Sequence, residues 1–256
     1  MKAVAVFLLF LSCLSLGHGW TCNEAPQQCH AAQIDAGQGQ VVLRDRDSRA
    51  YFLSGSHWYR LGSVYLKHVS VGDAGIWGVD NDNKVYKFIA GEFVPSNGQS
   101  LSQVDAGGVS QIVGVTKSDT IHCLKRSAAS AFKQEGTLSW DRLPGALKYF
   151  SCSPTNSCWG VNSAEQIFFT TLSPTTCKIS NWVHVSGAAV MVEVGSDGNV
   201  FVVNSGGDVF QRTGISAGNP QGTGWSHMKI SASHVSYDLG RLWVVSKGGV
   251  ITQCVP

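Results

Sequence analysis

Apolar and polar residues alternate along short stretches of this 256-residue chain, and polar turns separate the stretches. In residues 68–88, the segments HVSVG, IWGVD and KVYKF follow one another in this way. Alternation with a period of two is typical of half-buried β-strands. Three short strands cannot bury their own apolar faces, so the pattern predicts a strand-rich chain in which such units pack against one another.

The alternating unit recurs along the chain. Segments similar to QIDAG begin near residues 33, 68, 103, 149, 191 and 234, at spacings of 35 to 46 residues. A motif such as IWGVDNDNKVYKF follows each of them, and an aromatic-led strand such as WYRLGS follows most. Four strands in about 40 residues is the size of one propeller blade. We therefore expect an all-β fold, a six-bladed β-propeller.

The sixth unit is short, because only 22 residues remain from 235 to 256. Residues 20–33, which begin WTCNEAPQQC, would supply its missing fourth strand and complete a unit of 36 residues. Closure of this kind removes the free edges of an open array. The prediction is a single domain over residues 20–256 in which the N-terminal strand closes the last blade.

Residues 1–19, MKAVAVFLLFLSCLSLGHG, combine one lysine, an apolar run and small residues. This pattern is typical of a secretory signal peptide, so we expect a secreted, extracellular protein. No later segment reaches the roughly 18–20 apolar residues of a membrane span. Without Lys2, the chain has 18 basic and 17 acidic residues, a balance that argues against nucleic acid as a partner.

Seven cysteines remain after the signal peptide, and an export compartment favours disulfides. Closure of the last blade predicts a pair between Cys22 and Cys254. The blade register also favours Cys152 with Cys158 and Cys123 with Cys177. Other connectivities stay open, Cys22 with Cys29 above all. Cys29 is otherwise left over, which leaves a homodimer as an option.

The candidate binding residues are polar. Tyr237, Asp238 and Arg241 break the repeat pattern in the last unit, and a carboxylate with a guanidinium can bind vicinal hydroxyls. The alternative is a salt bridge at the ring seam. Asn162, Asn204 and Asp208 lie in turns where they could bind hydroxyls, although hairpin chemistry explains the same residues.

The repeated tryptophans are better explained by packing between blades than by stacking on sugar, because each unit needs one. The histidines show no HExxH motif and no close pair with ligand spacing. We therefore expect no metal site and no cofactor.

The W-G-V-[ND]-x(4)-[IV]-[YF] unit resembles a tectonin repeat, and GTGWSH with HVSYDLGRLWVVSKGG resembles the end of fish-egg lectins and leukolectins. The resemblance implies a secreted six-bladed propeller that binds N-acetylglucosamine, galactose or bacterial lipopolysaccharide. It also implies glycans and microbial surface polysaccharide as partners, and a role in innate defence.

The resulting hypothesis is a lectin without catalysis, whose similar sites gain affinity by avidity. A glycoside hydrolase would need a singular pair of carboxylates, whereas the acids here lie mostly in repeated turns. A propeller scaffold for protein–protein binding is the alternative function.

Overall fold

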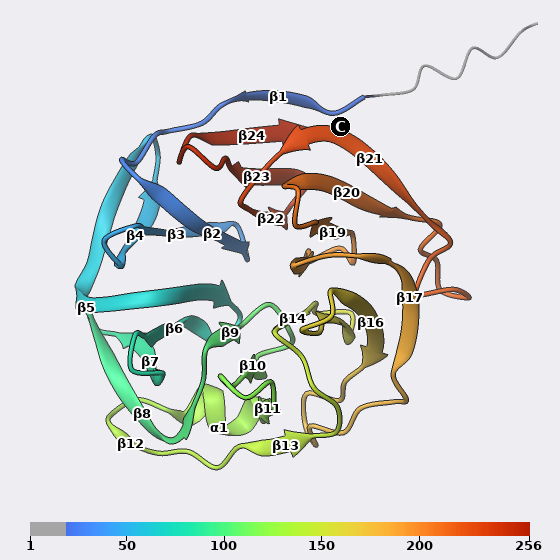
Figure 1. Ribbon diagram of the computed structural model, residues 1–256. Helices are drawn as coiled ribbons and strands as arrows, with labels where there is room; N and C mark the ends of the chain where they lie inside the picture. The colour runs from blue at the N-terminus through green and yellow to red at the C-terminus, as the bar shows by residue number, and fades with distance from the viewer. Residues whose placement is uncertain (1–18) are drawn as a thin grey trace, which may run out of the picture.

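The computed structural model describes residues 19–256, so the expected signal peptide lies outside the described residues except for Gly19. Most of the described chain forms β-strands in five sheets, and Figure 1 shows them arranged around a central axis like the blades of a propeller. The expected all-β, propeller-like fold is confirmed. In the part of the chain that the structure describes, no helix is long and apolar enough to cross a membrane.

The largest sheet has eight strands in the order β12-β8-β7-β6-β5-β4-β3-β2. Strand β5 belongs to two consecutive repeats, because its first half pairs with β4 and its second half with β6. Residues 68–88 form the end of β5, then β6 and β7. The strands are β2 (Ala31–Gly37), β3 (Gln40–Asp45), β4 (Arg49–Ser54), β5 (His57–Gly72), β6 (Gly75–Asp80), β7 (Lys84–Ile89), β8 (Glu92–Ser100) and β12 (Gly136–Thr137).

Three four-stranded sheets follow in chain order. The first contains β9 (Gln103–Asp105), β10 (Ile112–Val115), β11 (Ile121–Leu124) and β13 (Asp141–Leu143), with α1 (Arg126–Ala131) between the last two. The second contains β14 (Tyr149–Cys152), β15 (Ser157–Val161), β16 (Gln166–Thr171) and β17 (Val183–Ala188). The third contains β18 (Met191–Val194), β19 (Val200–Val203), β20 (Asp208–Thr213) and β21 (Gly224–Ser231).

The last sheet combines the two ends of the described chain. It contains β22 (His234–Asp238), β23 (Arg241–Val245), β24 (Ile251–Val255) and β1 (Thr21–Glu24) in the order β1-β24-β23-β22. Figure 1 shows β1, in blue, beside β24, in red. Cys22 lies opposite Cys254 in this antiparallel pair, and a disulfide joins them. The other disulfides are Cys123–Cys177 and Cys152–Cys158, and Cys29 is a free, exposed thiol.

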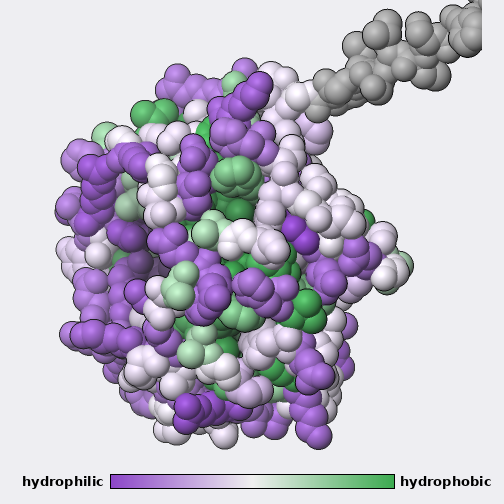
Figure 2. Space-filling view, turned by 45° about the vertical axis from the view of Figure 1, so that its right-hand side comes forward, coloured by the Kyte–Doolittle hydropathy of each residue, from purple (hydrophilic) through white to green (hydrophobic). Residues whose placement is uncertain are grey.

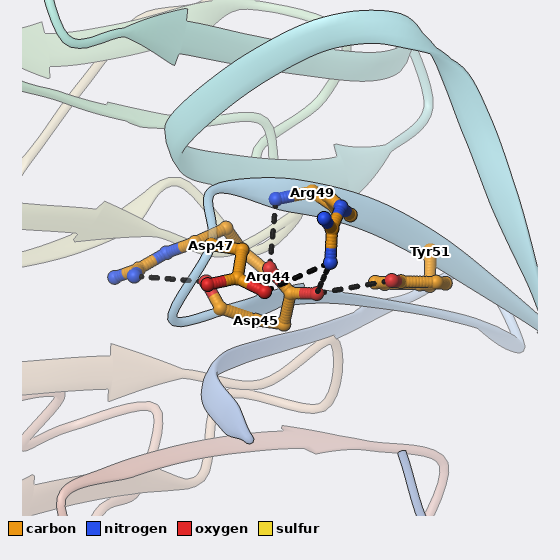
Figure 3. A network of polar contacts seen from close by, with 5 residues as sticks. All are labelled: Arg44, Asp45, Asp47, Arg49 and Tyr51. Atoms are coloured by element: carbon orange, nitrogen blue, oxygen red, sulfur yellow. Dashed lines mark hydrogen bonds and ion pairs between the residues drawn. The ribbon is translucent and has the colours of Figure 1, made fainter. Parts of the chain in front are cut away.

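The polar turn after the second strand of each repeat is held by one recurring hydrogen bond. In the turn of Figure 3, the Asp45 carboxylate accepts the Arg49 backbone N–H at 2.8 Å and the Tyr51 hydroxyl at 3.0 Å. Arg49 also pairs with Asp47 at 2.8 Å. Side chains that accept nearby N–H groups explain why turns use Asp, Asn, Ser and Thr. The six donor–acceptor pairs are Arg49–Asp45, Lys84–Asp80, Thr120–Thr116, Gln166–Asn162, Asp208–Asn204 and Val250–Ser246.

The inner strands around the axis are β2, the end of β5, β9, β14, β18 and β22, and each contacts the next. Side chains rather than a backbone ladder join neighbouring inner strands. The Val71 N–H donates to the Asp35 carboxylate, and the Cys152 N–H donates to Asp105 at 3.0 Å. Serines accept equivalent N–H bonds at Ser70, Ser151 and Ser236. An Asp or Ser at the centre of the repeated segment therefore links one repeat to the next.

The core consists of apolar clusters, and most of them lie between consecutive sheets. Trp77 and Trp159 are fully buried in two of these clusters, in agreement with their expected packing role. Figure 2 brings forward the side with β17 and β21, where groups of apolar residues lie between more numerous polar ones.

Candidate functional site

A pocket of about 300 Å³ lies at the seam between the β14–β17 sheet and the β18–β21 sheet. We call it the Trp225 pocket. Trp225, Phe210 and Ile167 form its apolar part, and Asn204 and Glu165 add polar groups. Aromatic rings beside a few oriented polar side chains are typical of a site for a small polar ligand with an apolar face.

Neighbouring repeats hold Trp225 in place. Its indole N–H donates to the Ser186 carbonyl of the preceding sheet at 2.7 Å. The Arg212 guanidinium stacks over the ring at 4.8 Å from its centroid. Gly187 makes the close approach possible, because a Cβ there would lie 3.1 Å from the indole nitrogen. The ring is therefore positioned before any ligand arrives, which lowers the entropic cost of binding.

The polar rim of the pocket connects the two sheets. The Ser205 hydroxyl donates to the Glu165 carboxylate at 3.1 Å, across the seam. Asn204 is used in its own turn, where its side-chain oxygen accepts the Asp208 N–H at 2.8 Å. Its side-chain nitrogen donates to the Asp208 carboxylate at 3.2 Å. Glu165 retains acceptor capacity toward the pocket, since a carboxylate can accept several hydrogen bonds.

Asn162 occupies the equivalent turn of the preceding repeat. Its side-chain oxygen accepts the Gln166 N–H at 2.9 Å, and its nitrogen donates to the Gln166 side chain at 2.9 Å. Asn162 is not among the residues that line the Trp225 pocket. Two turns with the same internal chemistry thus differ in their surroundings, and this difference makes Asn162 a natural control for Asn204.

Asp238 and Arg241 lie at a second, smaller pocket of about 230 Å³, together with Trp243 and Leu239. The Asp238 carboxylate is buried and accepts the Gly39 N–H at 2.7 Å, and it also accepts the Ser196 hydroxyl. Arg241 is exposed. The carboxylate therefore bridges the first, fifth and sixth repeats, instead of pairing with the nearby guanidinium.

Tyr237 is buried in the core at the seam between the fifth and sixth repeats. Its ring packs 4.9 Å from Phe201, and its hydroxyl donates to Asp197 at 2.9 Å. Burial, with this hydrogen bond, raises the pKa of Tyr237 to about 12. Asp238 and Arg241 lie at the β22–β23 hairpin, where β23 begins. Strand β23 ends at the Ser246 turn, which is equivalent to the Asn162 and Asn204 turns. The hairpin and the Asn turns therefore lie at opposite ends of the sheets.

Three buried carboxyl groups line the axis, one on every second inner strand: Asp35, Asp105 and Glu193. Burial, opposed by the Val71 N–H bond, raises the pKa of Asp35 to about 6. Burial and the neighbouring Asp35 charge raise the pKa of Asp105 to about 8. The pKa of Glu193 also lies well above its usual value, because of burial and both aspartates. Within residues 19–256, no group of three or more His, Cys, Asp or Glu side chains has an arrangement suited to a metal ion.

The family model of the tectonin domain matches residues 30–247, which is most of the chain. The chain belongs to the tectonin family. It is 44% identical to the fish-egg lectin of Cyprinus carpio over 158 residues, covering 60% of this chain and 66% of that lectin. The match therefore spans slightly less than two thirds of the carp protein. The chain is also 26% identical to the 31 kDa subunit of perivitellin-2 from Pomacea maculata, over 71% of this chain and 82% of that subunit.

Solved structures with the same fold are distant in sequence. A luciferin-regenerating enzyme superposes with a TM-score of 0.62 at 10% identity, covering 93% of this chain and 96% of that one. Virginiamycin B lyase from Staphylococcus aureus superposes with a TM-score of 0.58 at 10% identity, covering 93% and 99%. These similarities establish the propeller-like architecture of the tectonin chain and nothing about its chemistry.

Sequence reasoning selected Asn204 but missed Trp225, Phe210 and Glu165, which complete its pocket. Trp225 was interpreted as packing because each unit has such an aromatic. A glycine at position 187 was the one available signal, since a residue without a side chain often marks the close approach of another group. Whether that approach leaves a pocket depends on the side chains of two sheets together.

Proposed function

We propose that this tectonin-family protein is a secreted lectin without catalytic activity, and that it binds a sugar in the Trp225 pocket. The supporting observation is the pocket itself, in which a pre-positioned indole faces the same space as Glu165 and Asn204. An apolar ring suits the C–H face of a pyranose, and the carboxylate and amide suit its hydroxyls. The name of the carp relative, a fish-egg lectin, supports the same function.

We also infer a six-bladed propeller over residues 20–256, closed by the N-terminal strand. The six equivalent turns support the blade count, and β1 paired with β24 supports closure. In this interpretation the eight-stranded sheet is two blades that share β5. The disulfides support export, as does the apolar leader in residues 1–19.

The proposed ligands are N-acetylglucosamine-type or galactose-type sugars, including those of bacterial lipopolysaccharide, in a role in innate defence. Weak sites on one rigid body would gain affinity on a glycan-coated surface. The absence of catalysis is supported by the roles of Asp35 and Asp105. Their carboxylates accept backbone N–H bonds from the next inner strand and thus serve the fold.

The test is a glycan array, followed by titration calorimetry with free N-acetylglucosamine and with galactose. Trp225→Ala should lower the affinity for the bound sugar by about tenfold or more, since it removes the apolar platform. Trp182→Ala is the matched control, because Trp182 donates to Pro144 in the same manner at the preceding seam. Asn204→Ala and Asn162→Ala form a second pair, in which only the first should weaken binding.

Equal loss of affinity in Trp225→Ala and Trp182→Ala would place the sugar elsewhere. An array without any glycan or lipopolysaccharide signal would refute the lectin function and favour a scaffold for protein partners. Such a scaffold is the alternative that propeller folds commonly serve.

A further inference from the structure

The seam between the fifth and sixth repeats differs from the other seams in a way that changes its chemistry. At three seams, an aromatic that leads one outer strand packs against a glycine of the preceding repeat. A Cβ at Gly187 would lie 3.1 Å from Trp225, one at Gly145 would lie 3.0 Å from Trp182, and one at Gly62 would lie 3.2 Å from Phe93. The glycines have positive φ angles of 128°, 105° and 54°. These positions favour glycine both for its conformation and for its lack of a side chain.

Lys229 in β21 lies four residues after Trp225, as Gly62 lies four residues after Trp58, and its φ of 57° matches the 54° of Gly62. Gly145 and Gly187 lie one residue further along, five residues after Trp140 and Trp182. A non-glycine residue in the left-handed region costs free energy, and such strain points to a function at that position. A lysine chain also could not fit where an indole covers the backbone. Lys229 therefore requires a seam without that indole.

The register shows that the indole is indeed missing from this seam. We call the residue whose side chain accepts the recurring turn hydrogen bond the turn anchor: Asn204 in the fifth repeat and Asp45 in the first. The residues eight positions after these anchors are Arg212 and Leu53, and they lie opposite Trp225 and Trp58. In the last sheet the residue eight positions after the Ser246 anchor is Cys254, and its partner is Cys22. A disulfide thus replaces the aromatic. Trp20, two residues before Cys22, donates its indole N–H to Gln211 at 3.1 Å.

A cavity of about 790 Å³ opens at this seam, and we call it the Lys229 pocket. Lys229 and His227 provide its basic groups, Gln211 and Ser226 provide uncharged polar groups, and Trp20 provides an apolar wall. No Asp or Glu is among the described residues that line it. His227 has one carboxylate nearby, that of Asp208, which lies 3.9 Å from the His227 ring nitrogen. Lys229 takes part in no ion pair within residues 19–256.

We propose that the Lys229 pocket is a second binding site, specific for sugars that carry an oxyanion: a phosphate ester, a sulfate ester or a carboxylate. The proposal rests on the proposed lectin function and extends it from neutral to charged sugars. The Lys229 ammonium supplies the charge, since a charge-assisted hydrogen bond is about twice as strong as a neutral one. The hydroxyl, amide and indole groups around it contact the sugar ring.

The test compares the wild-type chain with Lys229→Gly, which introduces the residue that Gly62 provides in the first repeat and removes the backbone strain. Calorimetric titrations would use N-acetylglucosamine 6-phosphate, N-acetylglucosamine 6-sulfate, glucuronic acid and uncharged N-acetylglucosamine. Lys229→Gly should lower the affinity for the bound anionic sugar by about tenfold or more, and Lys229→Arg should retain that affinity. Lys117→Ala, an exposed lysine in a distant turn, is the control for general charge.

The melting temperature of Lys229→Gly should equal or exceed that of the wild type, because glycine relieves the left-handed strain. Binding of uncharged N-acetylglucosamine at the Trp225 pocket should not change in this variant. Anionic and neutral sugars with the same affinity, or anionic binding that Lys229→Gly leaves intact, would overturn the second site and leave the proposed function standing. A different result would overturn the Trp225 pocket instead. In that case the chain would bind an anionic sugar through Lys229, would keep this binding in Trp225→Ala, and would bind no uncharged sugar.

Discussion

Replacement of Asp35 by asparagine tests whether ionisation of the buried carboxyl groups along the axis destabilises the folded state. Asp35 is buried and has the acidic residues Asp105, Glu193 and Asp238 as neighbours. Its pKa is raised from 3.8 to about 6. In the unfolded chain the group ionises near pH 4, whereas in the folded chain it keeps its proton to about pH 6. The folded state therefore binds more protons in this window, and stability falls as pH rises through it.

The size of this loss follows from the shift in pKa. One pKa unit corresponds to about 1.4 kcal/mol, so a shift from 3.8 to about 6 costs about 3 kcal/mol of stability above pH 6. Asparagine has the same shape without the charge, and its carbonyl oxygen can still accept the Val71 N–H. Asp35→Asn should therefore raise the melting temperature at pH 8, by up to about 6–12 °C for a domain of this size.

The assay is thermal unfolding from pH 3 to pH 8, in a buffer with EDTA so that no divalent cation neutralises the carboxylates. The wild type should lose stability between pH 4 and pH 6, and the variant should have a flatter profile there. Asp73→Asn, at an exposed aspartate, should leave the profile unchanged. A variant that melts lower at pH 8 and keeps the wild-type slope would refute the reasoning, since the carboxylate would then stabilise the fold in its charged form.

Three further predictions concern the seams. Cys22→Ser should lower the free energy of unfolding by about 2–5 kcal/mol, measured by urea denaturation, because it releases the cross-link to Cys254; an unchanged midpoint would contradict this. Gly187→Ala should lower the melting temperature and alter the fluorescence of Trp225, since the added methyl meets the indole and φ is 128°; wild-type values in both measurements would count against the close approach. Asp238→Ala should destabilise the fold by about 1–3 kcal/mol, whereas Arg241→Ala should not, because the buried carboxylate satisfies two donors on other repeats; equal melting temperatures for the two variants would contradict the bridge.

The repeat was readable because each unit needs the same local chemistry. The side chains at Asp45, Asn162 and Ser246 differ, yet each offers an oxygen to the N–H four residues later, so polarity at this position persists through the sequence. The same holds for Asp or Ser at the centre of the inner strand, which accepts an N–H from the next strand. Such constraints act within a short segment or once per repeat, and a single sequence records them as a period.

The candidate site was less readable, because it depends on pairs of repeats. Tyr237 and Asp238 break the pattern as a ligand site would, but their polar atoms contact Asp197, Gly39 and Ser196 on other strands. These partners lie about 40 and 200 residues away, so no local pattern reveals them.

The sequence by itself determined the strands, the turns, the repeat and the family of this protein, since period-two alternation and Asx chemistry act over a few residues. Only the tertiary structure decided at which seams between repeats a pocket forms. Trp225 lines its pocket together with Ile167 and Glu165 of the preceding sheet, and these residues lie about 60 positions away in the sequence. The replacement of an aromatic by Cys22 and the presence of Lys229 can be related only because the two residues, 207 positions apart, line the same cavity.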